Sequence, residues 1–188
     1  MRRVFFGLEV PFSVKQRLLA VQTDINGARW QGRHQLHLTL AFIGSVDDAG
    51  LETLRRAACR VTAPAFELRV QGLGVFGKPD HPRNLWAGIS PEHPVIELHE
   101  RLTDSLSGAG FAQEKRRFRP HITVSRFRRN AGSVASLLDA HGSTGFGAMA
   151  VTEFVLYEST PGAGGSVYTV LDRFPLTPSL DETDPSGQ

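Results

Sequence analysis

Residues 35–43 read QLHLTLAFI, and this stretch decides the first half of the predicted fold. Polar and apolar residues alternate at its start and the rest is continuously apolar, which predicts a strand that ends at Gly44. Residues two apart in a strand point to the same face, so His37 and Thr39 share one face. The two leucines that alternate with them point the other way and can pack into a core.

A second stretch, HITV at residues 121–124, repeats the pattern 84 positions later (121 − 37 = 84). His121 and Thr123 again share one face of a predicted strand. One His-x-Thr is expected by chance about 0.45 times in this chain (7 His × 12 Thr / 188), so two matched copies indicate a function. The competing interpretation is that both pairs are ordinary strand residues facing solvent. If the two strands meet, a cleft gains two imidazoles and two hydroxyls.

The elements around these strands follow from apolar periodicity and turn residues. Ser13 with Gln16 predicts a capping box, and Asp47 or Asp48 can cap the second helix. We expect strands at residues 2–10, 35–43, 65–75, 85–90, 119–126, 149–158 and 166–174, and helices at residues 13–25, 48–60, 94–107 and 133–140.

The order helix, His-x-Thr strand, helix, strand, strand therefore occurs twice. It predicts an α+β fold of two similar lobes, each an antiparallel sheet with outer helices, around a central cleft. Residues 1–177 would form this single domain, with the strand at 2–10 added to the first lobe. Residues 178–188 are polar and are expected to be a disordered tail.

Composition indicates a globular protein: 40% of the 188 residues are hydrophobic and 21% are charged. The basic start resembles a signal peptide, but Glu9 and Pro11 interrupt its apolar run, so we expect a first strand, no membrane span and a cytoplasmic location. The single Cys59 is expected to fill a small space in the core. We expect a monomer with no obligate protein partner.

The net charge of +2 hides an asymmetry. Residues 115–129 hold seven Lys or Arg and no acid, so the rest of the chain carries 14 bases against 19 acids, a net of −5. A basic segment in an acidic body indicates an anionic partner at that place. The alternative is a solvated surface turn in an arginine-rich chain, which has 18 Arg and 3 Lys.

Two imidazoles and two hydroxyls suit the cleavage of a phosphodiester. One imidazole can deprotonate the attacking oxygen and the other can protonate the leaving oxygen. The hydroxyls can donate hydrogen bonds to the other phosphate oxygens. A metal site is the alternative, but His34 and His37 point to opposite faces and no Cys or carboxylate pair is near in sequence, so we expect neither a metal nor a cofactor. The remaining histidines are expected at the surface: His81, His93, His99 and His141.

Several stretches resemble those of a known family. The HLTL and HITV pair is similar to that of the two-histidine (2H) phosphoesterases. Within that superfamily, the chain resembles the RNA 2′,3′-cyclic phosphodiesterases, also called 2′-5′ RNA ligases, over about residues 2–174. The stretches that carry this resemblance are RVFFGLEVP at 3–11, HLTLAFIG at 37–44, RPHITVSR at 119–126 and VTEFVLYES from 151 with Tyr168 after it.

The resemblance implies a bilobal fold and metal-independent hydrolysis of 2′,3′-cyclic phosphate ends of RNA, which leaves a 2′-phosphate. It also implies that the same residues can join RNA ends by 2′-5′ linkage without ATP. His37 would be the proton donor and His121 the proton acceptor, with Thr39 and Thr123 holding the phosphate oxygens.

Candidate contacts to the RNA lie near the second motif and among the aromatic residues. Arg119 lies two residues before His121 and shares its face, whereas Arg126 lies five after it and does so only if the chain bends. The resemblance nevertheless implies a phosphate contact for Arg126. Phe6, Phe42 and Tyr157 could stack on a base, with core packing as the competing interpretation for each.

Two other functions stay open. The same catalytic scaffold could act on another substrate, such as a cyclic nucleotide-sugar phosphate or a 2′-5′ oligoadenylate. A non-catalytic RNA-binding protein that uses the basic segment is the second alternative, although binding alone does not require the His and Thr pairs.

Overall fold

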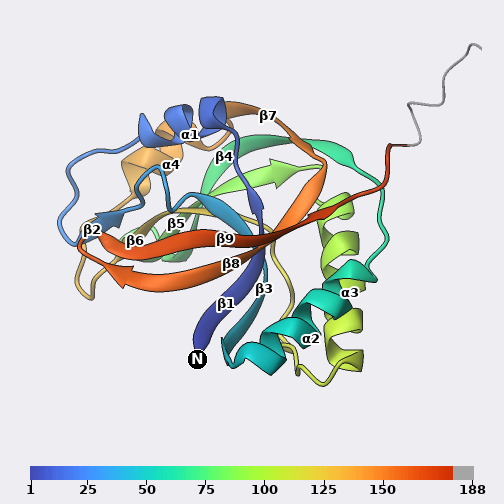
Figure 1. The fold of residues 1–188 in the computed structure, drawn as a ribbon. Coiled ribbons are helices and arrows are strands. Elements are labelled where there is room, and N and C mark those ends of the chain that lie inside the picture. The colour runs from blue at the N-terminus through green and yellow to red at the C-terminus, as the bar shows by residue number, and fades with distance from the viewer. Residues whose placement is uncertain (180–188) are drawn as a thin grey trace, which may run out of the picture.

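The computed structural model describes residues 1–179, and it has the expected α+β class (Figure 1). Its strands are β1 Arg2–Glu9, β2 Ala28–Trp30, β3 His37–Val46, β4 Phe66–Lys78, β5 His81–Ser90, β6 Ile122–Phe127, β7 Gly145–Val151, β8 Glu153–Gly162 and β9 Gly165–Pro175. Its helices are α1 Phe12–Leu19, α2 Asp48–Cys59, α3 His93–Gly108 and α4 Ala135–His141.

All strands belong to one antiparallel sheet in the order β7-β4-β5-β6-β3-β1-β8-β9, with β2 also paired to β6. The two strands that carry the repeated pattern, β3 and β6, are neighbours at its centre. Each half of the sheet forms one of the two expected lobes, and β1 adds to the half that contains β3.

The halves are interleaved in the chain. The β4–β5 hairpin follows β3 in sequence but pairs with β6, while the β8–β9 hairpin follows β6 but pairs with β1 beside β3. Each lobe therefore combines a motif strand from one repeat with the hairpin from the other.

The apolar backs of the motif strands lie in one hydrophobic core. Leu38 and Ile122, which face each other across the centre of the sheet, are both fully buried. Burial of such a side chain is worth about 1.5–3 kcal/mol. Helix α1 packs on β7 and α4 on β4, while α2 and α3 pack on each other, with α3 against β3 and α2 against β3 and β9 (Figure 1).

Of the two predicted helix N-caps, that of α2 is confirmed and that of α1 is wrong. Asp47 caps α2, because its carboxylate accepts a hydrogen bond of 2.7 Å from the backbone N–H of Gly50. The capping box at Ser13 is wrong: Pro11 occupies the N-cap with extended backbone, and its carbonyl accepts the N–H of Lys15 at 3.0 Å. The helix also ends at Leu19 rather than near residue 25.

Two further expectations are wrong. The strand predicted at 149–158 is two strands, β7 and β8, which lie in opposite halves of the sheet. Cys59 is exposed rather than in the core. The buried face of α2 is made by Leu51, Leu54, Ala57 and Ala58, and one further residue turns the side chain of Cys59 away from it.

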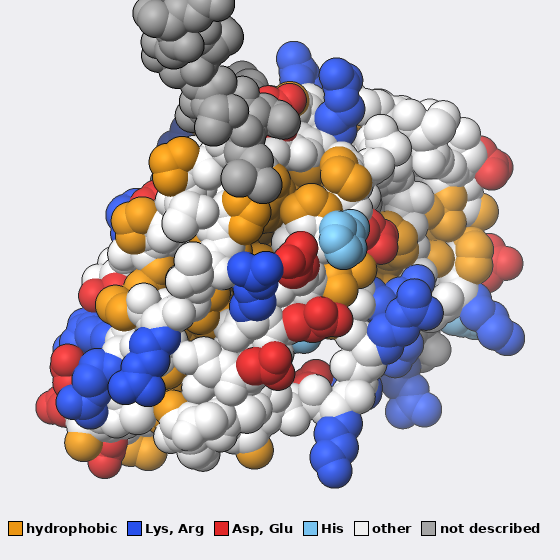
Figure 2. All heavy atoms as spheres, turned by 90° about the vertical axis from the view of Figure 1, so that its right-hand side faces the viewer, with side chains coloured by type: hydrophobic (Ala, Val, Ile, Leu, Met, Phe, Trp, Pro, Cys, Tyr) orange, Lys and Arg blue, Asp and Glu red, His pale blue; other side chains and the backbone are white. Residues whose placement is uncertain are grey.

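In residues 1–179 no helix is long and apolar enough to span a membrane. The face that includes α2 and α3 carries acidic and basic side chains intermixed, so it offers no patch of a single sign (Figure 2). Thr177 makes a bridge with Pro64, and most of the tail predicted to be disordered lies outside the described residues.

Candidate active site

The register of β3 against β6 brings the two motifs together. Leu38 lies opposite Ile122 in an antiparallel pair. Partner numbers in such a pair have a constant sum (38 + 122 = 160), so continuing the register by one residue on each side of this bridge sets His37 against Thr123 and Thr39 against His121. The polar side chains of the two motifs therefore form two adjacent cross-strand pairs, called here the two rows. One row is His37 with Thr123, and the other is His121 with Thr39.

The backbone holds both imidazoles in the same way. Nδ1 of His37 donates to the carbonyl of Gln35 at 2.7 Å, and Nδ1 of His121 donates to the carbonyl of Arg119 at 2.6 Å. In each case the acceptor lies two residues before the histidine. These hydrogen bonds place the proton of the neutral ring on Nδ1 and leave Nε2 free to exchange a proton with a substrate.

Aromatic side chains surround His37. The ring centroids of Phe5, Tyr157 and Tyr168 lie 5.0, 5.8 and 4.9 Å from that of His37. Nε2 of His37 lies 2.9 Å from Oγ1 of Thr39, so the hydroxyl can donate to the neutral ring or accept from the charged one. Both ring nitrogens of His37 thus have a hydrogen-bond partner, and the rest of its environment is largely apolar.

This surround favours the neutral ring. The pKa of His37 is lowered to about 4, chiefly by burial and also by the charges of Arg126, His121 and Lys15, while the hydrogen bond to the carbonyl of Gln35 opposes the change. An anion bound beside the ring would favour the charged form and raise this pKa again.

His121 has a more open setting. Phe76 lies edge-on to it with ring centroids 4.9 Å apart, and Trp86 lies 6.3 Å away. Burial lowers the pKa of His121, and the charges of Arg126 and Arg119 lower it further. Within the described chain, Nε2 of His121 has no hydrogen bond to protein.

A β-bulge turns Arg126 toward the site. Thr123 pairs with Trp86 and Ser125 with Leu85, so Val124 is an extra residue in β6, and it is buried together with Ser125. An extra residue shifts the alternation of faces by one. Arg126 therefore lies on the side of His121 despite its odd spacing, and its charge lowers the pKa of both histidines.

The same irregularity occurs at the same place in β3. Thr39 pairs with Gly7 and Ala41 with Phe6, so Leu40 is the extra residue, and it is buried together with Ala41. Phe42 is consequently turned outward and is 60% exposed. It occupies the position in β3 that Arg126 occupies in β6, because both lie five residues after a motif histidine.

Two cavities lie near the motif residues, and one of them is lined by Thr39 and His121. The one beside His121, called here the His121 cavity, has a volume of about 460 Å³. The residues that line it are Thr39, Leu40, Ala41, Phe42, Phe76, Arg83, Asn84, His99, Gln113, Glu114, Arg116, Arg117, Phe118, Arg119 and His121.

The second, the Tyr168 cavity, has a volume of about 320 Å³. Its wall is formed by β2, by the turn between β8 and β9, by Gln35 before β3 and by Arg126 of β6. These residues are Arg29, Trp30, Gln31, Gln35, Arg126, Pro161, Gly162, Gly164, Gly165, Ser166 and Tyr168.

The residues expected to bind substrate fall into two groups. Phe42 and Arg119 line the His121 cavity and Arg126 lines the Tyr168 cavity, so these three are placed where a ligand could reach them. Phe6 has no exposed surface and packs in the core, which excludes base stacking. Tyr157 is 6% exposed and stacks on Phe5 behind His37, so it supports the imidazole instead.

His99 was expected to be an ordinary surface residue, and this prediction is wrong. It is half-buried in the wall of the His121 cavity, donates from Nδ1 to the carbonyl of Leu40 at 2.7 Å, and stacks on Phe118 at 3.8 Å. Neither contact has a local sequence signal, because Leu40 and Phe118 are 59 and 19 residues away (99 − 40 and 118 − 99).

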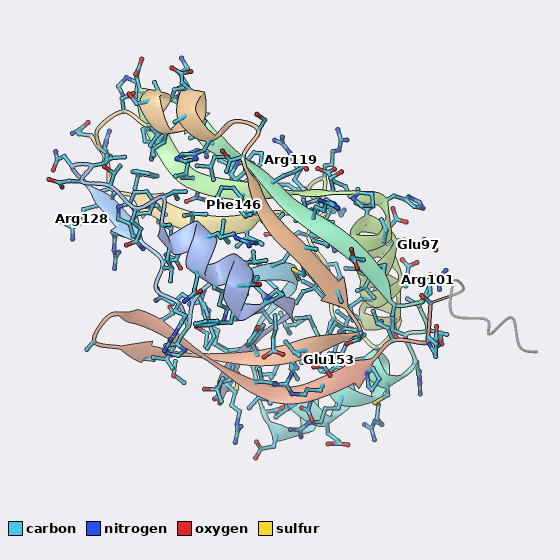
Figure 3. All side chains as sticks on the ribbon, turned by 90° about the horizontal axis from the view of Figure 1, so that it is seen from above. Glu97, Arg101, Arg119, Arg128, Phe146 and Glu153 are labelled. Carbon is cyan, nitrogen blue, oxygen red and sulfur yellow. The ribbon has the colours of Figure 1, made fainter. Side chains whose placement is uncertain are left out.

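The basic segment at 115–129 does not form one patch. Arg116, Arg117 and Arg119 line the His121 cavity, whereas Arg126 lines the Tyr168 cavity. Arg119 and Arg128 lie well apart when the molecule is viewed from above (Figure 3). Among the described residues, no group of three or more His, Cys, Asp or Glu could hold a metal ion.

The chain is similar to known proteins in both sequence and structure. The family model of the 2′-5′ RNA ligase superfamily matches residues 11–163. RNA 2′,3′-cyclic phosphodiesterase of Escherichia coli (strain K12) is 31% identical over 181 residues, covering 94% of this chain and 97% of that protein. The enzyme of the same name from Thermotoga maritima is 30% identical over 175 residues, covering 90% of this chain and 92% of that protein. A crystal structure of E. coli LigT complexed with 3′-AMP matches with a TM-score of 0.79 at 30% identity, over 94% of this chain and 98% of that one.

Proposed function

Because the chain belongs to the 2′-5′ RNA ligase superfamily, we propose that it hydrolyses 2′,3′-cyclic phosphate ends of RNA to 2′-phosphomonoesters, as an RNA 2′,3′-cyclic 3′-phosphodiesterase. The observation that carries this proposal is the bridge between Leu38 and Ile122 at the centre of the sheet, whose register sets His37 against Thr123 and His121 against Thr39. The relatives that bear the name of this activity are similar over nearly the whole chain.

The proposed reaction uses one histidine at each end of the breaking and forming bonds. His121 takes a proton from water through its free Nε2, and the water oxygen attacks phosphorus. The bond from phosphorus to the 3′ oxygen breaks, and His37 gives that oxygen its proton. Each such proton transfer typically accelerates a reaction about 10²–10⁴-fold.

The hydroxyls and the arginine hold the phosphate during this step. Thr39 and Thr123 lie in the two rows and can donate to the non-bridging oxygens. Arg126 can neutralise the phosphate charge, since the bulge in β6 turns it to this side. The negative phosphate also raises the pKa of His37 toward its ordinary value, so substrate binding helps to supply the acid form.

The same groups support ATP-independent 2′-5′ joining of RNA ends. A 5′-hydroxyl then replaces water as the nucleophile, and His37 protonates the same 3′ oxygen. The energy comes from opening the cyclic phosphodiester, so no nucleotide triphosphate is needed.

The test uses a short RNA with a 2′,3′-cyclic phosphate end in the presence of EDTA. We expect a 2′-phosphate product, and we expect H37A and H121A each to lower kcat by about 10²–10⁴-fold. H93A is the matched control, because His93 lies on the exposed first turn of α3, with its Nε2 3.6 Å from a carboxylate oxygen of Glu97. Activity that survives either substitution, or that EDTA removes, would contradict the proposal.

The same assay separates the two alternatives. Turnover of a 2′-5′ oligoadenylate or a cyclic nucleotide-sugar phosphate with a much higher kcat/KM would indicate another substrate on this scaffold. RNA binding that depends steeply on salt, with no cleavage and no effect of H37A or H121A on affinity, would indicate a binding protein.

A further inference from the structure

Besides His121, the His121 cavity is lined by His99, which belongs to neither motif and comes from α3. Nδ1 of His99 donates to the carbonyl of Leu40 at 2.7 Å. The ring of His99 stacks on Phe118, with the two ring centroids 3.8 Å apart and the two planes within 7° of parallel. One side chain therefore joins three segments that are far apart in the sequence: α3, β3 and the connection that leads to β6.

The contact with Leu40 holds the bulge of β3. Leu40 is the extra residue of that strand and directly follows Thr39. The extra residue of a bulge is left out of the regular pairing between strands. Leu40 is also buried, so a carbonyl without a donor at this place would carry the cost of its lost hydration. The Nδ1–H of His99 supplies the donor.

The matching bulge of β6 is held by a different kind of donor. Val124 is its extra residue and directly follows Thr123. The carbonyl of Val124 accepts a hydrogen bond of 2.9 Å from the backbone N–H of Gln31. Any residue except proline could supply that backbone donor. The bulge of β3 depends instead on one side chain, that of His99, so a substitution there should disturb one bulge and leave the other in place.

The contact with Phe118 reaches the support of His121. Phe118 directly precedes Arg119, whose carbonyl accepts the Nδ1–H of His121 at 2.6 Å. Within the described part of the chain, residues 112–119 form no backbone–backbone hydrogen bond, so side-chain contacts hold this connection. The stack of Phe118 on His99 is therefore an anchor one residue before the carbonyl that orients the imidazole.

We propose that His99 is a positioning residue for the proposed hydrolysis, on which this inference rests. Through the carbonyl of Leu40, it fixes the backbone that follows Thr39. Through Phe118, it fixes the carbonyl that orients His121. Reacting groups must be held within about 0.5 Å of the productive geometry, and His99 supports one such group in each motif.

Substitutions at His99 separate its two contacts. H99F keeps an aromatic ring against Phe118 and removes the donor to Leu40. Displacement of a reacting group by about 1 Å can cost about 10²-fold in rate, so a partial displacement in H99F should lower kcat for a cyclic-phosphate RNA end about tenfold. H99N places an amide N–H near the position of Nδ1 and removes the ring. It should recover part of this loss and match F118L, with kcat about threefold below wild type in both.

S105A is the matched control for a purely structural role. Ser105 lies on the same helix as His99, and its Oγ donates to the carbonyl of Ala57 in α2 at 2.7 Å. S105A thus removes a hydrogen bond of the same length and should lower the free energy of unfolding while kcat stays unchanged. Circular dichroism sets a temperature at which every variant is folded. Equal kcat values for H99F and S105A at that temperature would overturn the proposal.

The route through Thr39 is tested by combining substitutions. If His99 acts by fixing the backbone after Thr39, the hydroxyl of Thr39 carries most of its effect. H99F should then lower kcat of the T39V protein only about twofold or less, because the two substitutions disturb one unit. A further tenfold fall in the T39V background would overturn this route.

The route through Phe118 has a readout that does not depend on turnover. At neutral pH the lowered pKa of His121 keeps its ring uncharged, and nitrogen NMR of the wild-type ring should show the proton on Nδ1. F118L should show a mixture of the two tautomers, whereas S105A should match wild type. An unchanged His121 signal in F118L would overturn this route. Absence of hydrolysis by the wild-type protein would remove the proposed function, and the spectra would still decide whether the His99 stack supports His121.

Discussion

The strands β3 and β6 share one backbone design and differ in the walls around it. In both, Nδ1 of the motif histidine donates to the carbonyl two residues earlier, and in both a bulge follows three residues after the histidine. His37, however, is enclosed by Phe5, Tyr157 and Tyr168, whereas His121 borders a large cavity. Two strands with the same backbone arrangement can therefore place two identical histidines in different surroundings.

The unequal walls fit the proposed roles. An enclosed imidazole is shielded from water and is suited to protonating an oxygen of the bound substrate. An imidazole at the edge of a cavity can reach a nucleophile that enters from solvent. The position five residues after each histidine is also unequal, with an exposed apolar ring at Phe42 and a cation at Arg126.

The largest expected difference between the two strands comes from displacing Trp86, which packs near His121 and not near His37. A Cβ at Gly74 would lie 2.2 Å from Cζ2 of Trp86, so G74A must displace the indole that packs near His121. Displacement of a catalytic group by about 1 Å can cost about 10²-fold in rate, and we expect a fall in kcat of that order. Steady-state kinetics measure it, and G108A is the control because nothing lies within 4 Å of its added Cβ. Equal kcat values for the two variants would contradict this role of Trp86.

The second prediction compares the cost of burying each imidazole. The pKa of His37 is lowered from 6.5 to about 4 by burial, so below pH 6.5 the unfolded chain binds more protons than the folded one. The free energy of unfolding therefore has its full value above pH 6.5 and decreases as the pH falls toward 4, because protonation favours the unfolded chain. Between pH 7 and pH 4, the wild-type free energy of unfolding should fall about 2 kcal/mol more than that of H37N.

Urea unfolding at a series of pH values measures this difference. H121N is the matched variant, since His121 lies in a more open setting and its removal should change the pH dependence less. A pH dependence that H37N leaves unaltered would show that the folded protein tolerates a charged ring at this position.

The third prediction separates the two threonines. Only Thr39 contacts its own histidine, with Oγ1 2.9 Å from Nε2 of His37. T39V keeps the shape and removes the hydroxyl, and loss of one hydrogen bond worth about 1 kcal/mol should lower kcat/KM about fivefold more than T123V does. The limb of the pH–rate profile that reports His37 should move in T39V alone. Indistinguishable profiles for T39V and T123V would argue that this contact has no catalytic importance.

The smallest expected effect is a shift of the pH optimum. The charge of Arg126 lowers the pKa of both histidines, whereas that of Arg119 lowers the pKa of His121 only. In R126Q both limbs of the profile of kcat/KM against pH should move to higher pH, on top of weaker phosphate binding. In R119Q only the limb of His121 should move. If the pH optimum of R126Q is unchanged, the charge of Arg126 in the wild-type protein lies farther from the imidazoles during turnover than in the free protein.

Local sequence pattern was enough for the class of fold and for the polar face of each motif strand. Alternation sorts His37 and Thr39 from their leucine neighbours because a strand has a fixed period of two residues. It failed where both faces of a strand are apolar. In β1 the neighbours Phe5 and Phe6 look alike, yet Phe5 contacts His37 and Phe6 lies in the core. A shift of one residue exchanges the two faces, and nothing local fixes it.

The sequence by itself thus determined that two strands would each present an imidazole and a hydroxyl beside an apolar back. Only the tertiary structure decided that β3 and β6 pair directly, that a bulge brings Arg126 to the site, and that the walls of the two halves differ. The physical reason is range. Side-chain periodicity depends on neighbours along the chain, whereas strand pairing, bulges and cavities depend on contacts between segments tens of residues apart.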